Sequence, residues 1–169
     1  RPLERLVPAE QEVADTDQIP EAIADEMKAM GLYGMTIPEA YGGLGLTMEE
    51  EVHVLFELCQ TSPAFRSLLG TTVGIGSQGL VMDGTPEQKA AWLPRMATGE
   101  IVASFCLTEP EAGSDAASLR TRAVKEGDHY VVTGTKRYIT NAPQAGMFTL
   151  MARTDPGVAG ANGISAFIV

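Results

Sequence analysis

Phe105-Cys-Leu-Thr-Glu-Pro-Glu-Ala-Gly-Ser-Asp115 is the most informative stretch of the 169-residue sequence. The apolar run from Ile101 to Leu107 predicts a buried strand that ends at the hydroxyl of Thr108. Turn-forming residues follow, because Pro presets φ, Gly permits positive φ, and Ser and Asp bond their own backbone. Such a loop can direct several backbone N–H groups at one point, which makes a nest for an anion such as phosphate. Taken alone, a Gly-Ser-Asp loop favours an ordinary β-turn between strands, and only the full stretch with its flanks favours the anion site.

A second polar segment, Tyr138-Ile-Thr-Asn141, ends the next long strand-like run, about 30 residues after Thr108. Both strand ends carry hydroxyl groups and free amides. Together they could hold a flat polar ring that bears a diphosphate tail. The sequence therefore favours a cofactor site built from these two segments.

The C-terminal part of the chain reads as a β domain. Val, Ile, Thr and aromatic residues predict strands, and Glu126-Gly127-Asp128 predicts a tight hairpin turn between two of them. We expect an antiparallel, barrel-like sheet that is incomplete at residue 169. The predicted strands cover residues 101–107, 118–125, 130–139, 147–153 and 164–169.

The first 100 residues read as helices with short connections, which is typical of a helical bundle. Helices are expected over 1–14 and 20–30, and capping boxes at Thr47 and Thr85 predict the start of two more. Ser62-Pro63 predicts the start of a nearly uncharged segment that runs to about residue 82 and should be buried almost all round. The fold class is therefore α+β, with an α domain over 1–100 and a β domain over 101–169. The helix that begins after Thr47 is expected to carry one apolar face, which points inward and consists of Val52, Leu55, Phe56 and Cys59.

Composition excludes several classes of protein. A net charge of −10 argues against nucleic-acid binding, which requires clustered Lys and Arg. No apolar run approaches the ~20 residues needed to span a bilayer. Cys59 and Cys106 have neither metal-ligand spacing nor a disulfide framework, so we expect two buried thiols and a reducing, cytoplasmic location.

The ends of the chain suggest a fragment of a longer protein. The first residue is Arg rather than Met, and the last seven residues read as a strand that stops within its apolar run.

Four motifs in the same order resemble the acyl-CoA dehydrogenase family of flavoproteins. The segment Cys106–Ser118 is similar to the first family signature, and Gly134–Asn141 is similar to the second flavin-binding strand. Pro38–Gly45 and Gly84–Pro94 also match. The resemblance covers nearly the whole chain. It implies an N-terminal α domain, a middle β domain and a C-terminal helical bundle that this chain lacks.

The resemblance also implies a function: FAD-dependent oxidation of an acyl-CoA thioester to the trans-2-enoyl thioester in fatty acid β-oxidation. Electrons would pass to an electron-transfer flavoprotein, and the enzyme would be a homotetramer. The catalytic glutamate would lie beyond residue 169, so no catalytic residue is assigned here, and these 169 residues alone should not turn over. Ser114 would also touch the substrate. The implied FAD-binding residues are Phe105, Cys106, Leu107, Thr108, Gly113, Ser114, Tyr138, Ile139 and Thr140.

Three positions depart from the family pattern: Phe105 stands where Tyr is common, Glu111 where Gly is common, and Tyr138 where Trp is common. An acyl-CoA oxidase, a related flavin monooxygenase and a non-catalytic binding protein of the same fold stay open as alternatives. Glu109 is interpreted as a structural residue of the turn. Either an acyl slot or close helix packing explains the side chains of Ser67, Leu68, Thr71 and Thr72.

Overall fold

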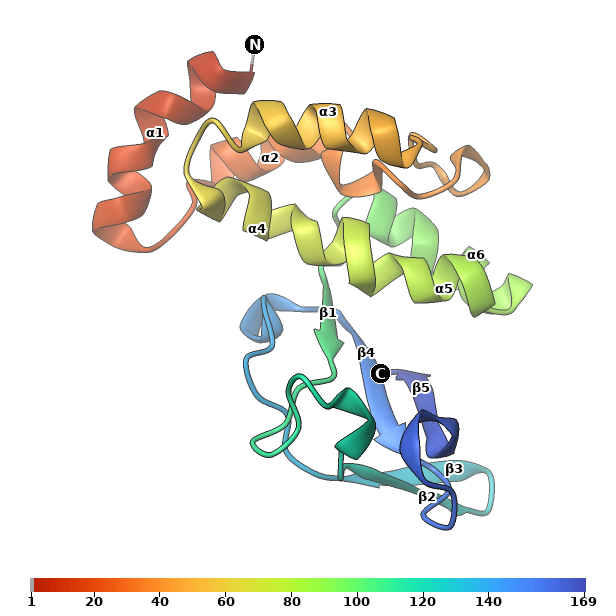
Figure 1. Ribbon diagram of the computed structural model, residues 1–169. Coiled ribbons are helices and arrows are strands. Elements are labelled where there is room, and N and C mark those ends of the chain that lie inside the picture. Colours follow the sequence, from red (N-terminus) through yellow and green to blue (C-terminus); the bar gives the residue numbers. More distant parts are fainter. Residues whose placement is uncertain (1) are drawn as a thin grey trace. The chain divides into compact units, whose positions relative to one another are not determined.

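The computed structural model describes residues 2–169, and Arg1, the first residue of the first expected helix, lies outside this range. The chain forms two compact units, Arg1–Val102 and Ala103–Val169 (Figure 1). The first unit is helical and the second contains the strands. This order confirms the α+β prediction of a helical part followed by a β-sheet part.

Among residues 2–102, six α-helices build the first unit, and local sequence signals place several of their ends. Both predicted capping boxes are present: Thr47 pairs with Glu50, and Thr85 pairs with Gln88. Ser62 caps the helix that begins at Pro63, also as predicted. The helices are α1 (Pro2–Thr16), α2 (Glu21–Ala29), α3 (Met48–Leu58), α4 (Pro63–Thr71), α5 (Ser77–Asp83) and α6 (Pro86–Ala97), with single turns η1 (Leu32–Gly34), η2 (Glu39–Tyr41) and the π-type η3 (Thr72–Gly76).

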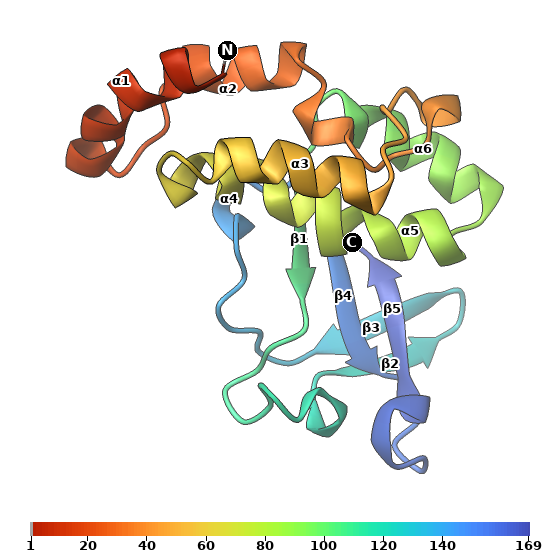
Figure 2. The same cartoon turned by 45° about the horizontal axis from the view of Figure 1, so that its top comes forward.

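The core of the helical unit forms where these helices meet. The α1 helix contacts α3, and α3 contacts α4 (Figures 1 and 2). Burying apolar side chains between these helices stabilises the unit by about 25 cal/mol per Å² of apolar surface removed from water. Fully or nearly buried side chains in this core include Met27, Tyr33, Leu58, Phe65, Leu69 and Val73.

The predicted inward face of α3 is wrong. Val52 and Phe56 are 41% and 68% exposed, whereas Leu58 is 1% exposed and Leu55 is half-buried. Cys59 is exposed as well, so only Cys106 is a buried thiol. This helix carries apolar residues on more than one side, and the tertiary contacts select the side that contains Leu58.

The nearly uncharged segment after Pro63 is also less buried than predicted. Ile75 is 58% exposed and Met82 is 73% exposed. The backbone leaves helical geometry at Gly74, inside the π-type turn η3. This turn separates α4 from α5, so the two helices do not present one continuous buried surface.

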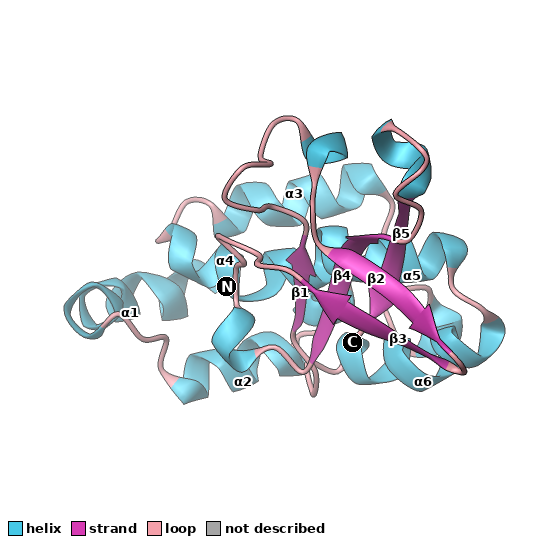
Figure 3. Cartoon of the chain, turned by 90° about the horizontal axis from the view of Figure 1, so that it is seen from below, coloured by secondary structure: helices cyan, strands magenta, loops and turns pink. Residues whose placement is uncertain are grey.

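The second unit is a five-stranded sheet: β1 (Ala103–Cys106), β2 (Arg122–Glu126), β3 (His129–Thr133), β4 (Met147–Arg153) and β5 (Ile164–Ile168). Strand β4 pairs with β1 on one edge and β5 on the other, and its last residue pairs with β2 (Figure 3). The β2–β3 hairpin turns at Gly127, whose φ of 66° suits glycine.

Three expectations about the sheet need correction. The sheet is mixed, because β1 and β2 both run parallel to β4 while the other pairs are antiparallel. The strand expected over 130–139 ends at Thr133, which pairs with Arg122, the first residue of its partner strand β2. The next residue, Gly134, lies so close to Thr121 that an added Cβ would come 2.3 Å from its hydroxyl oxygen. The strand expected from residue 118 begins at Arg122, after the single turn η4 (Ala116–Ser118). Within residues 2–169, no helix is long and apolar enough to cross a membrane.

Candidate functional site

The two polar strand ends expected from the sequence lie side by side in the β unit. The Arg137 N–H donates to the Thr108 carbonyl oxygen over 2.9 Å, and the Ser104 hydroxyl donates to the Thr140 carbonyl oxygen over 2.6 Å. Residues 104–108 and 137–140 therefore run in opposite directions along each other. Because hydrogen bonds join the two segments, their polar groups are held next to each other.

The loop after Thr108 is tied at its base and open at its tip. Glu109 and Ala112 exchange backbone hydrogen bonds of 2.9 and 3.3 Å across a tight turn. Gly113 and Ser114 are exposed, and a Cβ added at Gly113 would meet nothing within 4 Å. Among residues 2–169, the N–H groups of Gly113 and Ser114 have no hydrogen-bond partner. The loop thus offers unpaired donors and open space, which suit an anion.

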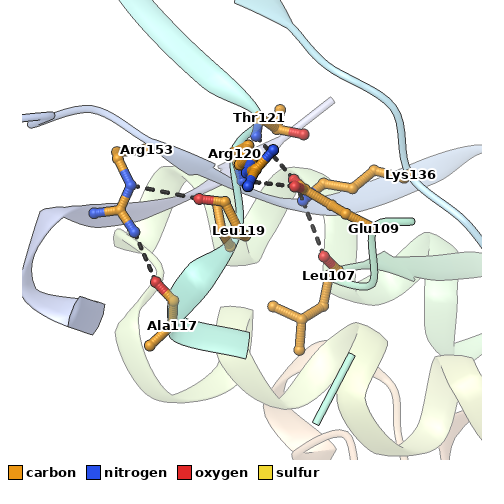
Figure 4. A network of polar contacts seen from close by, with 8 residues as sticks. All are labelled: Leu107, Glu109, Ala117, Leu119, Arg120, Thr121, Lys136 and Arg153. Carbon is orange, nitrogen blue, oxygen red and sulfur yellow. Dashed lines mark hydrogen bonds and ion pairs between the residues drawn. The ribbon is translucent and has the colours of Figure 1, made fainter. Parts of the chain in front are cut away.

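A buried ion pair lies beneath this loop (Figure 4). The Lys136 ammonium lies 2.8 Å from Glu109 Oε1 and donates to the Leu107 carbonyl oxygen over 3.0 Å. The two side chains are only 10% and 3% exposed. Glu109 Oε2 and Oε1 also accept the backbone N–H groups of Arg120 and Thr121 over 2.6 and 2.9 Å. One carboxylate therefore joins three segments of the β unit.

The surroundings of Glu109 keep it ionised. Burial alone would raise the pKa of this carboxyl group, but hydrogen bonds from Lys136, Thr121 and Arg120 lower it to about 2. Burial also raises the pKa of the Cys106 thiol, and the Lys136 ammonium opposes that effect. Glu109 is therefore a structural anion of the turn, in agreement with its interpretation from the sequence.

A second cation, Arg153, holds other loops of the same unit together. The Arg153 guanidinium donates to the carbonyl oxygens of Ala117 and Leu119 over 2.7 and 3.4 Å (Figure 4). It also donates to the Val158 and Gly160 carbonyl oxygens over 3.1 and 3.2 Å. Arg153 thereby fastens η4 and Leu119 to Val158 and to the first residue of η6 (Gly160–Gly163).

The expected cofactor residues differ in accessibility. Tyr138 is 78% exposed at a φ of 57°, and the Arg137 guanidinium lies 4.6 Å from the centre of its ring. Cys106 is buried, so it can contribute only backbone groups to a ligand. Phe105, Leu107, Thr108 and Ile139 are half-buried, whereas Gly113, Ser114 and Thr140 are exposed.

Sequence reasoning missed the roles of Lys136 and Arg153. Lys136 lies within a recognised motif, but its partner Glu109 is 27 residues earlier. The sequence did contain a signal for this pair, because the acidic Glu109 follows the first strand end and the basic Lys136 precedes the second. At the residues suggested for an acyl slot, Thr71 and Thr72 are buried and Ser67 is exposed, and the full burial of Thr72 favours close packing at that position.

Family models match both units of the chain. Residues 3–100 match the acyl-CoA dehydrogenase N-terminal domain, and residues 104–169 match the acyl-CoA dehydrogenase middle domain. The chain belongs to the acyl-CoA dehydrogenase family. The sequence-based recognition of this family is confirmed.

Individual proteins of known sequence or structure also match most of this chain. The (2S)-methylsuccinyl-CoA dehydrogenase of Cereibacter sphaeroides is 45% identical over 150 residues, which cover 89% of this chain and 27% of that protein. The chain also superposes on a solved structure of the electron transferring flavoprotein of Acidaminococcus fermentans (TM-score 0.92, 35% identity, 99% of this chain and 44% of that one).

A glutaryl-CoA dehydrogenase of Mycobacterium smegmatis, solved in complex with FADH2, gives a TM-score of 0.86 at 34% identity, covering 98% of this chain and 41% of that one. The chain thus spans less than half the length of each of these proteins.

Proposed function

We propose that the protein is an FAD-dependent acyl-CoA dehydrogenase that introduces a double bond between the α and β carbons of a fatty acyl-CoA thioester. The observation that carries this proposal is the pairing of residues 104–108 with 137–140 beside an open loop with unpaired N–H groups. Membership of the acyl-CoA dehydrogenase family supports it independently.

The residues present fit a flavin nucleotide. The N–H groups at Gly113 and Ser114 are suited to a diphosphate, and Glu111 is exposed, so its carboxylate can stay in solvent. The backbone at Phe105, Leu107 and Thr108 would hold one side of the ring. Tyr138, Ile139 and Thr140 would hold the other. When bound, the flavin accepts a hydride equivalent from the β-carbon, while the protein fixes its orientation.

No carboxylate of this chain is assigned as the base for the α-proton. Glu109 is unsuitable because its side chain is 3% exposed, accepts hydrogen bonds from three donors and has a pKa of about 2. A general base needs a pKa near the working pH and a free approach to the substrate. We propose that the base is supplied by sequence beyond residue 169, as the family resemblance implies.

Electron transfer to an electron-transfer flavoprotein, a homotetrameric assembly and a cytoplasmic location belong to the same proposal. The match to the Acidaminococcus fermentans electron transferring flavoprotein structure supports the first. The two cysteines, which form no disulfide, support the third. Ser114, exposed on the loop, is the proposed contact to the acyl-CoA substrate within this chain.

Anaerobic titration of the FAD-loaded, full-length protein with acyl-CoA thioesters tests this function. We expect the flavin absorption to bleach with one range of acyl lengths. Rapid recovery of the colour on admitting air would instead indicate the oxidase alternative. A bound flavin that no thioester bleaches would contradict the dehydrogenase assignment.

A further inference from the structure

Lys136 and Arg137 hold two consecutive carbonyl groups of the first strand end. The Lys136 ammonium binds the Leu107 carbonyl oxygen over 3.0 Å, and the Arg137 N–H binds the Thr108 carbonyl oxygen over 2.9 Å. Glu109, 2.8 Å from the same ammonium, fixes the position of the lysine side chain. The backbone between Leu107 and Glu109 is thus restrained on each of its peptide units.

This restraint sets the direction of one N–H group. A trans peptide unit is planar, and its C=O and N–H groups point to opposite sides. Because Lys136 holds the Leu107 carbonyl, the Thr108 N–H must point away from the lysine. Within residues 2–169, the Thr108 N–H has no hydrogen-bond partner. It is an oriented and unpaired donor at the end of the first strand.

The charge of Lys136 also strengthens that donor. A hydrogen bond from a cation is shorter and stronger than a neutral one, and the low exposure of both side chains limits solvent screening. A carbonyl polarised by a cation makes the N–H of the same peptide unit a better donor, because hydrogen-bonded chains polarise one another.

We propose that Lys136 is a positioning residue for the flavin ring, acting through the peptide unit that joins Leu107 to Thr108. This inference rests on the proposed function, because it assigns the oriented Thr108 N–H to the flavin. Lys136 itself does not touch the cofactor. Glu109 serves the same purpose by keeping the ammonium in place.

The test combines two substitutions with two measurements. Lys136→Met removes the ammonium but leaves the Glu109 carboxylate buried and unpaired, which can impair folding. The double variant Glu109→Gln/Lys136→Met removes both charges and therefore keeps the proposal testable if the single variant folds poorly. In the full-length protein, FAD affinity is measured by quenching of flavin fluorescence, together with the visible spectrum of the bound flavin. We expect at least about a tenfold weaker affinity and a shifted spectrum in both variants.

Phe167→Ala is the matched control. Phe167 packs edge-on against Tyr130, with ring centres 5.1 Å apart, and pairs with Leu150 rather than with either strand end. This variant should lose stability while the affinity for FAD and the flavin spectrum stay at wild-type values. Wild-type affinity and spectrum in both Lys136 variants would overturn the proposal.

Hydrogen exchange of the FAD-free protein separates this inference from the proposed function. Exchange at the Arg137 amide should be faster in Lys136→Met than in Phe167→Ala, because only the first variant releases the strand end. Failure of the wild type to bind FAD would overturn the proposed function, and equal exchange in the two variants would overturn the role of Lys136.

Discussion

Replacing Glu109 with Gln should destabilise the β unit strongly at neutral pH. The carboxylate is 3% exposed and accepts the Lys136 ammonium and two backbone N–H groups. A Gln amide presents only one oxygen to these donors, and its NH₂ group would face another donor. Breaking a buried ion pair by removing one partner typically costs about 3–5 kcal/mol.

The pKa of Glu109 gives an independent magnitude. Its value of about 2 in the folded protein lies well below the ordinary 4.5, so ionisation favours the folded state. At about 1.4 kcal/mol per pKa unit, the difference corresponds to about 3 kcal/mol. Because the folded pKa is the lower one, this stabilisation is fully present above pH 4.5 and is lost as the pH falls through about 2.

Urea unfolding between pH 2 and pH 7, followed by far-ultraviolet circular dichroism, measures this effect. We expect Glu109→Gln to lose about 3 kcal/mol at pH 7 and to converge with the wild type near pH 2. Glu100→Gln is the control, since its partner Arg95 is 50% exposed and Glu100 is 58% exposed, so the loss should stay below about 1 kcal/mol. Equal stability of wild type and Glu109→Gln at pH 7 would refute the reasoning.

Three further predictions concern other parts of the chain. Gly134→Ala should lower the free energy of unfolding in urea by about 1–3 kcal/mol, because the new Cβ would lie 2.3 Å from a hydroxyl oxygen. Gly113→Ala, whose Cβ would meet nothing within 4 Å, should keep wild-type stability and weaken FAD binding. Thr85→Ala removes the cap of α6 and should lower thermal stability by about 1 kcal/mol, and an unchanged melting temperature would contradict the capping box. In a thiol-labelling experiment, Cys59 should react in the native protein and Cys106 only after unfolding, and equal rates would contradict their assigned exposure.

Structural features that depend only on neighbouring residues were predicted correctly from the sequence. The capping boxes at Thr47 and Thr85 and the turn at Gly127 depend on residues within about one turn of each other, and all three are present. The strand Met147–Arg153 also has the bounds that its composition predicted.

Features that depend on tertiary contacts were not predictable in the same way. The buried side of α3 is chosen by packing, because Val52 and Leu58 are equally apolar in the sequence. The early end of β3 at Thr133 coincides with the start of its partner strand β2 at Arg122, and the composition of residues 130–139 does not reveal where that partner begins. Lys136 is paired with a carboxylate 27 residues away, a contact that no local pattern encodes.

The central claim is that residues 104–108, the loop at Gly113 and Ser114, and residues 137–140 together bind a flavin. A visible absorption spectrum of the full-length protein, recorded after incubation with FAD and removal of the free cofactor, tests it most directly. The account predicts flavin bands that stay with the protein and diminish in Gly113→Ala. A protein that retains no flavin absorption after this treatment would contradict the account.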